Sequence, residues 1–588
     1  MTKIRLLIIL QLLFIFFLSD KNAFSQSDAD TKYWIIFKDK GEFDPGEKIT
    51  PGSKAYEEGK KLLTERAVQR RLKVLTEENL IDYADLPLEN SYVKKIKENG
   101  VDIIAQSRWL NGVSAYLSAA EAEKIIGLDF VDHLMFVNTL VKQIIEHDQE
   151  SGGSEKSDTL NKLNYGKSLR QMESVNVPKV HNLNITGKGV LIASFDDGFD
   201  WRNHESLSEL NITDEYDFIN KDGNTFPEKN QKYKDSKKQG SHGTATVSSM
   251  SGFKEGYLIG PAFDSEIILA KTEYIDTETP MEEDFWLEAT EWAEAKGVDI
   301  ITSSLIYKKY DAPYNNNSYA YDNFDGNTAI ITNAADRAAY LGIVVCQAMG
   351  NYFQTDEPSL GSAADADSII SVGAVTFSGD PASFTSNGPT KDGRTKPDVV
   401  APGVNVYTAT MKDVSGNTST YEYSSGTSFS TPIVAGICAL ILSAHPELTP
   451  MQVRDAIRNT ASQSGTPDNT LGWGMVNAYD AMLYHGMIWS NDFTVEKIKN
   501  DELKISTYLA SKDIVDVSSV KMNFSFDNGK NFESMNMDLV SVTDEKTNSG
   551  KYSAVIKLDR NMDDFKVYFS AEDNSGKKSE FPKVSFSN

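Results

Sequence analysis

Cysteine, net positive charge and long apolar runs are all scarce in this chain of 588 residues. Its two cysteines, Cys346 and Cys438, both lie in apolar segments, which favours two free buried thiols over a disulfide. A formal net charge of −26 argues against nucleic acid or an anionic membrane as a partner, because both would repel the protein. The one long apolar run is at the N-terminus, so we expect no membrane span in the mature chain.

Residues 1–25 have the composition of a secretory signal. Lys3 and Arg5 precede an apolar stretch from Leu6 to Leu18, and small residues suited to cleavage follow it. The stretch is shorter than the roughly 20 residues that a membrane helix needs. We therefore expect a secreted or periplasmic protein, with an uncleaved N-terminal anchor as the alternative.

Two further segments precede the largest part of the chain. Residues 26–145 mix strand-like and helical pieces, an α+β pattern in which Ser118 and Glu121 have the spacing of a helix capping box. Residues 146–160 are polar and rich in glycine and serine, a composition that cannot bury a core. We interpret them as a linker, the easiest place for a proteolytic cut.

The remaining sequence divides into two folds. Residues 161–490 alternate apolar strands with helices, which predicts an α/β domain with a doubly wound, mostly parallel sheet. Residues 494–588 change to short alternating runs separated by turn residues. This pattern predicts a small β-sandwich, which we expect to be immunoglobulin-like.

Three segments of the α/β region carry residues suited to acyl transfer. Asp196 ends a strand in Phe-Asp-Asp-Gly, His242 lies in Ser-His-Gly-Thr, and Ser428 lies in Gly-Thr-Ser-Phe-Ser-Thr-Pro. A serine hydroxyl is a weak nucleophile and needs a base to take its proton. Histidine titrates near neutrality and can be that base, while a buried carboxylate holds the imidazole in the required tautomer. The three segments together predict a nucleophilic hydrolase site.

The order Asp, His, Ser, with these flanking residues, resembles the subtilisin-like serine proteases (peptidase family S8). The resemblance covers about residues 161–490 and implies a serine endopeptidase that cleaves protein or peptide substrates through an acyl-enzyme intermediate. It makes Asp196, His242 and Ser428 the catalytic residues and Asn351 the oxyanion-hole residue. The pocket for the substrate residue before the cleaved bond is implied to be lined by Ser304, Leu305, Ala348, Met349 and Gly350.

The same resemblance gives the N-terminal segment a role. Subtilisin-like zymogens carry a propeptide at this position, so residues 26–145 are expected to inhibit the enzyme, with an ordinary accessory domain as the alternative. We predict the maturation cut near residues 140–165. We expect no cofactor, with a structural calcium ion left open.

One residue departs from the family pattern. Ile306 stands where relatives often have glycine, on the strand that pairs with substrate, which leaves substrate preference open. Met349 could offer an adaptable apolar wall, which favours an apolar or aromatic substrate side chain. Asp322 and Asp325 could bind a structural calcium ion, but they do not form a full calcium loop, and a solvated loop is favoured.

Two other functions stay open at this point. The domain could be a vestigial protease that acts as a binding or adhesion protein through its β-sandwich, although Asp196, His242, Asn351 and Ser428 are all intact. Alternatively, an intact site could serve a narrow processing enzyme with few targets. Hydrolysis of denatured casein against a limited peptide set would separate a broad protease from a narrow one.

Overall fold

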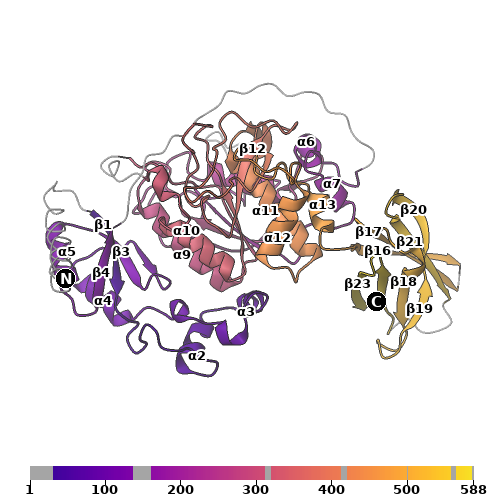
Figure 1. Cartoon of the computed structure of the whole chain (residues 1–588), viewed down its shortest axis with the longest axis horizontal. Coiled ribbons are helices and arrows are strands. Elements are labelled where there is room, and N and C mark those ends of the chain that lie inside the picture. The colour runs from indigo at the N-terminus through magenta and orange to yellow at the C-terminus, as the bar shows by residue number, and fades with distance from the viewer. Residues whose placement is uncertain are drawn as a thin grey trace, which may run out of the picture.

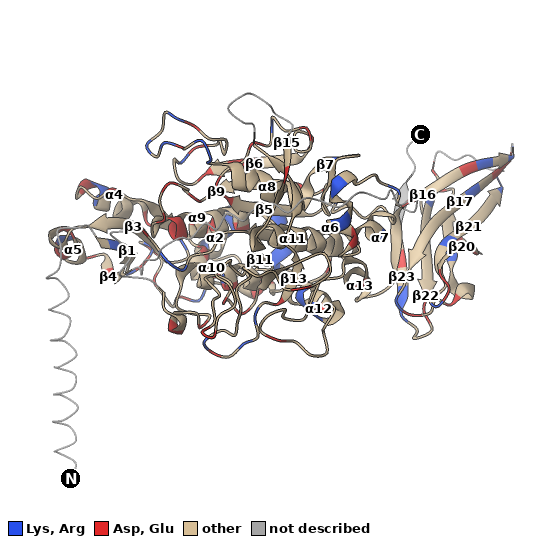
Figure 2. Cartoon of the chain, turned by 90° about the horizontal axis from the view of Figure 1, so that it is seen from above, with Lys and Arg blue, Asp and Glu red and all other residues tan. Residues whose placement is uncertain are grey.

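The computed structural model describes residues 31–136, 161–311, 319–411, 420–499, 501–557 and 564–585. They form three units arranged in a row, with the N-terminal unit and the C-terminal unit at opposite ends of a large central one (Figure 1). Acidic and basic residues are interspersed over all three units (Figure 2). The predicted signal at 1–25 and the predicted linker at 146–160 lie outside the described residues.

The N-terminal unit is a four-stranded antiparallel sheet with short helices, in the strand order β2-β3-β1-β4. Its strands are β1 (Thr31–Phe37), β2 (Ala105–Ser107), β3 (Gly112–Leu117) and β4 (Val131–Phe136). Its helices are α2 (Lys54–Lys61), α3 (Glu65–Arg71), α4 (Asn90–Glu98) and α5 (Ala119–Ile126). The predicted capping box of Ser118 and Glu121 is confirmed. The charged segment 54–80 is not one helix, because Thr64 caps a second helix soon after α2 ends.

The central unit is built on seven parallel strands in the order β13-β12-β11-β10-β5-β9-β6, the predicted doubly wound arrangement. The strands are β5 (Leu191–Asp196), β6 (Asn211–Asp217), β9 (Glu266–Lys271), β10 (Ile300–Ser303), β11 (Val344–Ala348), β12 (Ile370–Val375) and β13 (Val399–Pro402). Two small hairpins, β7 (Phe253–Lys254) with β8 (Leu258–Ile259) and β14 (Val406–Thr410) with β15 (Thr420–Ser424), lie outside this sheet.

Helices cover both faces of this sheet. Successive strand residues point to opposite sides, so each strand contributes side chains to two cores. Ile192 of β5 belongs to a core formed with α8 (Ser241–Ser251) and α11 (Thr427–Ala444), whereas Ala193 belongs to the core under α9 (Met281–Lys296) and α10 (Ile330–Tyr340). The first face also carries α6 (Leu169–Glu173), α7 (Val177–His181), α12 (Pro450–Thr460) and α13 (Ala478–Leu483).

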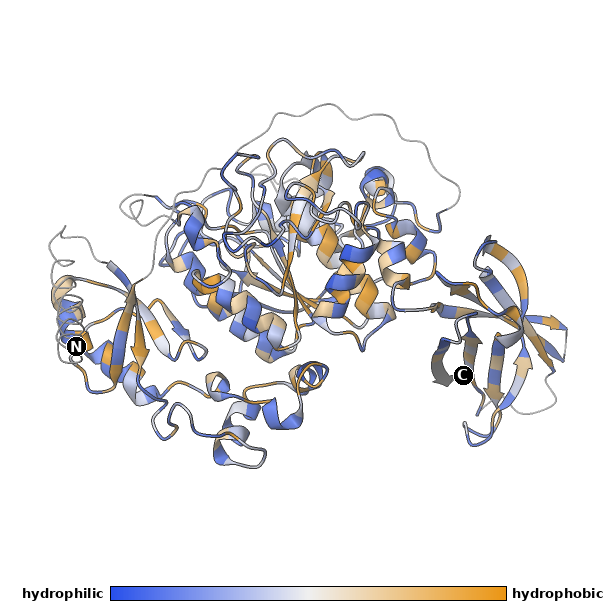
Figure 3. Cartoon of the chain, in the orientation of Figure 1, coloured by the Kyte–Doolittle hydropathy of each residue, from blue (hydrophilic) through white to orange (hydrophobic). Residues whose placement is uncertain are grey.

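Helix α11 runs through the middle of the central unit and is one of its most hydrophobic segments (Figure 3). Among the described residues it alone has the length and composition of a membrane span, yet 89% of it is buried inside the protein. Cys438 of α11 faces Cys346 of β11 with the two sulfur atoms 4.0 Å apart, and both are free and buried. The prediction of two free buried thiols is confirmed.

The C-terminal unit consists of two four-stranded antiparallel sheets, β16-β17-β21-β20 and β19-β18-β22-β23, whose inner residues share one core. This is the predicted β-sandwich. Its strands are β16 (Ile488–Lys499), β17 (Glu502–Ala510), β18 (Lys521–Ser525), β19 (Glu533–Asn536), β20 (Asp538–Asp544), β21 (Ser549–Lys557), β22 (Lys566–Glu572) and β23 (Lys578–Ser585). An immunoglobulin-like topology stays a prediction.

Candidate active site

Asp196 and His242 meet at the carboxyl edge of the central sheet. Asp196 is the last residue of β5 and His242 is the second residue of α8, so a strand end and a helix start place their side chains. His242 Nδ1 lies 2.7 Å from Asp196 Oδ1; the carboxylate side chain is 1% exposed and the imidazole 36% exposed. A donor at Nδ1 leaves Nε2 as the basic nitrogen, on the more exposed side of the pair.

The Asp196 carboxylate is fixed by two further donors. Thr246 Oγ1 donates to Oδ2 at 2.8 Å, and the backbone N–H of Asp197 donates to Oδ1 at 2.8 Å. Gly243 allows this close packing, because a β-carbon there would lie 2.9 Å from the β-carbon of Asp196. The orientation of the carboxylate, and through it that of the imidazole, is therefore set by the start of α8.

Asp197 takes the place of a side-chain cap on α8, whose N-cap residue is Gly240. Its carboxylate accepts from the backbone N–H of Gly243 at 2.8 Å and from that of His242 at 3.4 Å, two of the amides that a helix start leaves unpaired. Burial, together with the neighbouring Asp196, raises the pKa of Asp197 to about 7.

Ser428 is the second residue of α11. Proline is typical of a first helical turn, but Pro432 lies in the second turn of this helix. Proline has no N–H for the carbonyl four residues back, which is that of Ser428. Ser304 Oγ donates to this carbonyl instead, at 2.8 Å, and the Ser428 hydroxyl donates to the Ser304 carbonyl at 3.4 Å.

Asn351 lies beside the start of α11. Its Oδ1 accepts from both the backbone N–H and the hydroxyl of Thr427, each at 3.0 Å. Because Oδ1 is the acceptor in both bonds, the remaining side-chain atom is Nδ2, which points away from Thr427. Nδ2 lies 3.5 Å from the place that a β-carbon on Gly426 would occupy. Asp196, His242, Asn351 and Ser428 thus gather at one edge of the sheet.

The five expected substrate-binding residues come from two adjacent strand ends. Ser304 and Leu305 follow β10, whereas Ala348 ends β11 and Met349 and Gly350 follow it. Leu305 and Met349 belong to the core cluster beneath the sheet, and Met349 is completely buried. The sequence suggested Met349 as an adaptable apolar wall of the pocket, and its side chain packs in this core.

Asp322 and Asp325, the two carboxylates considered for calcium, both contact protein groups. Asp322 pairs with Lys391. Asp325 accepts from the backbone N–H groups of Asn327 and Thr328 at 2.8 and 2.9 Å, as a turn-forming aspartate does. These contacts are those of a surface loop.

Comparison with known proteins agrees with this geometry. A model of the Subtilase family matches residues 187–474, and a model of the Peptidase S8 propeptide domain of Bacteroidota matches residues 32–153. Serine protease AprX of Bacillus subtilis (strain 168) is 32% identical over 321 residues, which are 51% of this chain and 67% of that protein. Subtilisin of Bacillus pumilus is 30% identical over 311 residues, 53% of this chain and 97% of that protein.

The chain belongs to the subtilase family. It is a serine-type endopeptidase, made as a zymogen with an S8 propeptide at its N-terminus.

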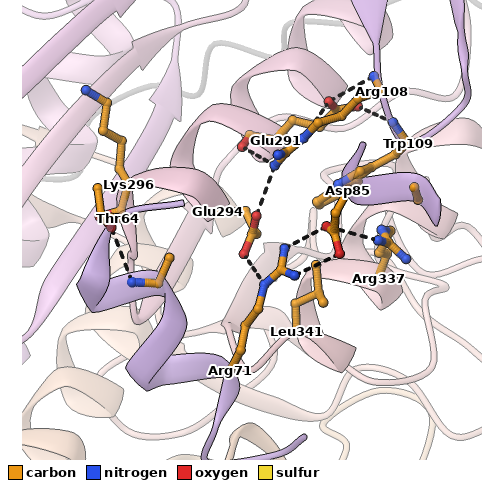
Figure 4. Close-up of polar contacts among 12 residues, drawn as sticks. Thr64, Arg71, Asp85, Arg108, Trp109, Glu291, Glu294, Lys296, Arg337 and Leu341 are labelled. Carbon is orange, nitrogen blue, oxygen red and sulfur yellow. Dashed lines mark hydrogen bonds and ion pairs between the residues drawn. The ribbon is translucent and has the colours of Figure 1, made fainter. Parts of the chain in front are cut away.

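The propeptide of this subtilase packs against the protease domain through a buried ionic cluster (Figure 4). Glu294 of α9 binds three propeptide arginines: Arg70, Arg71 Nε at 2.8 Å and Arg108 Nη2 at 3.0 Å. Arg71 also pairs at 2.8 Å with Asp85 of the propeptide. Burial raises the pKa of Glu294, but the guanidinium groups outweigh it and hold that pKa below its ordinary value.

Other acidic residues of α9 extend this contact toward the propeptide sheet. Asp284 accepts from Lys32 Nζ at 2.7 Å and from Trp34 Nε1 at 2.9 Å. Glu288 accepts from the backbone N–H of Gln106 at 2.8 Å, and burial raises its pKa to about 7. The propeptide therefore covers one long face of α9 with cations and N–H donors.

Sequence reasoning missed this interface. It assigned no role to the carboxylates of α9, and Glu294 is more than 200 residues away from Arg70 and Arg71. The sequence signal that could have revealed the interface is that α9 carries acidic side chains on several faces. A surface helix needs charged residues only on its solvated face.

Proposed function

We propose that this subtilase cleaves peptide bonds with Ser428 as nucleophile, His242 as general base and acid, Asp196 as the carboxylate that orients it, and Asn351 as an oxyanion donor. The observation that carries the proposal is the buried Asp196 bonded at 2.7 Å to a half-exposed His242, beside the helix start that holds Ser428. A carboxylate in this position fixes the imidazole tautomer and stabilises the imidazolium that forms during the reaction.

The reaction would proceed in two stages. Ser428 Oγ attacks the substrate carbonyl carbon while its proton passes to His242 Nε2. The carbonyl oxygen becomes negative and receives hydrogen bonds from Asn351 Nδ2 and from the Ser428 backbone N–H, which the first helical turn leaves unused. When the carbon–nitrogen bond breaks, His242 returns the proton to the leaving amine, and an ester remains on Ser428.

Water completes the cycle. It attacks the ester carbonyl, loses a proton to His242 and releases the acid product, and the proton then returns to Ser428 Oγ. The propeptide would hold the enzyme inactive until a cut near residues 140–165. The signal-like residues 1–25 would direct the chain out of the cytoplasm. The N-terminal sequence of the exported protein tests both positions.

A fluorophosphonate probe tests the nucleophile directly. We expect the matured enzyme to be labelled and Ser428→Ala to be unlabelled. Ser430→Ala is the matched control, because this buried serine lies on the same helix and donates to the Ala401 carbonyl at 3.0 Å. Labelling that persists in Ser428→Ala would place the nucleophile elsewhere. A matured wild type without labelling would leave the vestigial binding protein as the better interpretation.

A further inference from the structure

The Ile306 side chain lies close to two glycines, Gly361 and Gly350, beside the expected substrate-binding edge. A β-carbon on Gly361 would lie 2.3 Å from Ile306 Cγ2, and one on Gly350 would lie 3.4 Å from Ile306 Cδ1. The Ile306 side chain therefore packs against the backbone of Gly361 and reaches the space beside Gly350. Neither glycine has a side chain to close this gap, so Ile306 closes it.

The backbone on either side of Ile306 fixes the direction of its side chain. Tyr307 and Ser362 exchange two backbone N–H···O bonds of 3.2 Å, which joins segment 306–307 to the segment that begins at Gly361. Leu305 points into the core beneath the sheet and is 7% exposed. Because successive side chains of an extended segment alternate, Ile306 points to the opposite side and is half-buried.

The gap lies next to the reactive atoms. Gly350 immediately precedes Asn351, and Ser304, two residues before Ile306, forms two hydrogen bonds with Ser428. Segments 304–306 and 348–350 are the two strand ends that flank Ser428 and Asn351, so on the proposed function the first side chain of an acyl group on Ser428 would enter between them. Ile306 lies two residues, or roughly 7 Å, along the chain from Ser304, the residue that is hydrogen-bonded to Ser428.

We propose that Ile306 fills the pocket for the substrate residue before the cleaved bond, so that this protease selects small residues there and excludes aromatic ones. The inference rests on the proposed function, because it takes Ser428 and Asn351 as the reacting groups. It replaces the apolar or aromatic preference that the sequence suggested from Met349, whose side chain is completely buried. A branched side chain held by two backbone segments cannot move aside without displacing one of them.

Two peptide p-nitroanilides that differ only in the residue before the cleaved bond, alanine or phenylalanine, provide the test. We expect the matured wild type to prefer alanine by at least about tenfold in kcat/KM. Ile306→Ala and Ile306→Gly should raise kcat/KM for the phenylalanine substrate by about 10- to 100-fold, and change that for the alanine substrate by less than about threefold. Ile514→Ala, at a position 47% exposed in the C-terminal unit, is the control and should leave the ratio unchanged.

Fluorophosphonate labelling of each variant distinguishes an error in the pocket assignment from an error in the proposed function. A labelled wild type that prefers phenylalanine, or labelled Ile306 variants with the wild-type ratio, would overturn the pocket assignment and leave the proposed function intact. Absence of both labelling and hydrolysis in the wild type would overturn the two proposals together. The wild-type preference is itself decisive if neither Ile306 variant folds.

Discussion

Replacing Glu294 by glutamine removes one negative charge from a cluster that holds three propeptide guanidinium groups. The side chains of Arg70, Arg71 and Glu294 are at most 1% exposed, and that of Arg108 is 10% exposed. Removing one partner of a buried ion pair costs about 3–5 kcal/mol, since the remaining charges stay buried without compensation. At about 1.4 kcal/mol for each tenfold change, we expect the propeptide to bind Glu294→Gln roughly 10²- to 4 × 10³-fold more weakly.

The assay is inhibition of the matured protease by the propeptide. The propeptide is purified from the processed protein, and one preparation is titrated against wild type and variant while peptide hydrolysis is followed. The folding cost of the free propeptide then cancels between the two titrations. Glutamine keeps the shape of the side chain, so hydrolysis without inhibitor should remain at the wild-type rate.

Glu266→Gln is the matched control at the same interface. Glu266 pairs with Arg66 of the propeptide at 3.6 Å, but the two side chains are 36% and 33% exposed. Such pairs contribute about 0.2–1 kcal/mol, so inhibition should weaken by less than about sixfold. If Glu294→Gln binds the propeptide within fivefold of wild type, or no more weakly than Glu266→Gln does, the buried cluster does not contribute the predicted binding energy.

Three further outcomes follow from the same geometry. Asn351→Ala should lower kcat by about 10²- to 10³-fold with little change in KM, measured by steady-state hydrolysis, and an unchanged kcat would remove Asn351 from the oxyanion site. Glu288 has its pKa raised to about 7 in the complex and should return toward about 4.3 when exposed, so its protonation favours the complex. The contribution of Glu288 to propeptide affinity should therefore be largest below about pH 4.3 and be lost as pH rises to about 7, and Glu288→Gln should remove this contribution from the pH profile measured by inhibitor titration. A thiol reagent should find no reactive cysteine in the native protein and two, Cys346 and Cys438, after denaturation, and rapid native reaction would contradict their burial.

Much of the central fold could be predicted from local pattern. Apolar strands and helices alternate along the sequence, and the apolar run 267–270 forms all of β9 except its two end residues. The start of α11 could not be predicted, because Pro432 is a signal for a first helical turn. It is placed in the second turn here, where Ser304, more than 100 residues away, bonds the carbonyl that the proline leaves unpaired.

For the candidate site as well, short sequence motifs identify some residues, whereas others depend on contacts between residues that are distant in the sequence. Asp196, His242 and Ser428 could be found because each lies in a short recognisable segment. Ile306 was identified as unusual, but its effect depends on Gly361, which no local pattern joins to it. Pairing of the Arg70–Arg71 doublet with Glu294 likewise requires the propeptide and α9 to be placed in space.

The two hydrogen bonds between Ser304 and Ser428 join the expected substrate-binding edge directly to the proposed nucleophile. Ser304 lies on the edge that would receive the substrate backbone, and Ser428 would attack that substrate. A displacement of the edge would be passed to Ser428 through these bonds. Alignment of the reacting atoms would therefore depend first on this pair of residues.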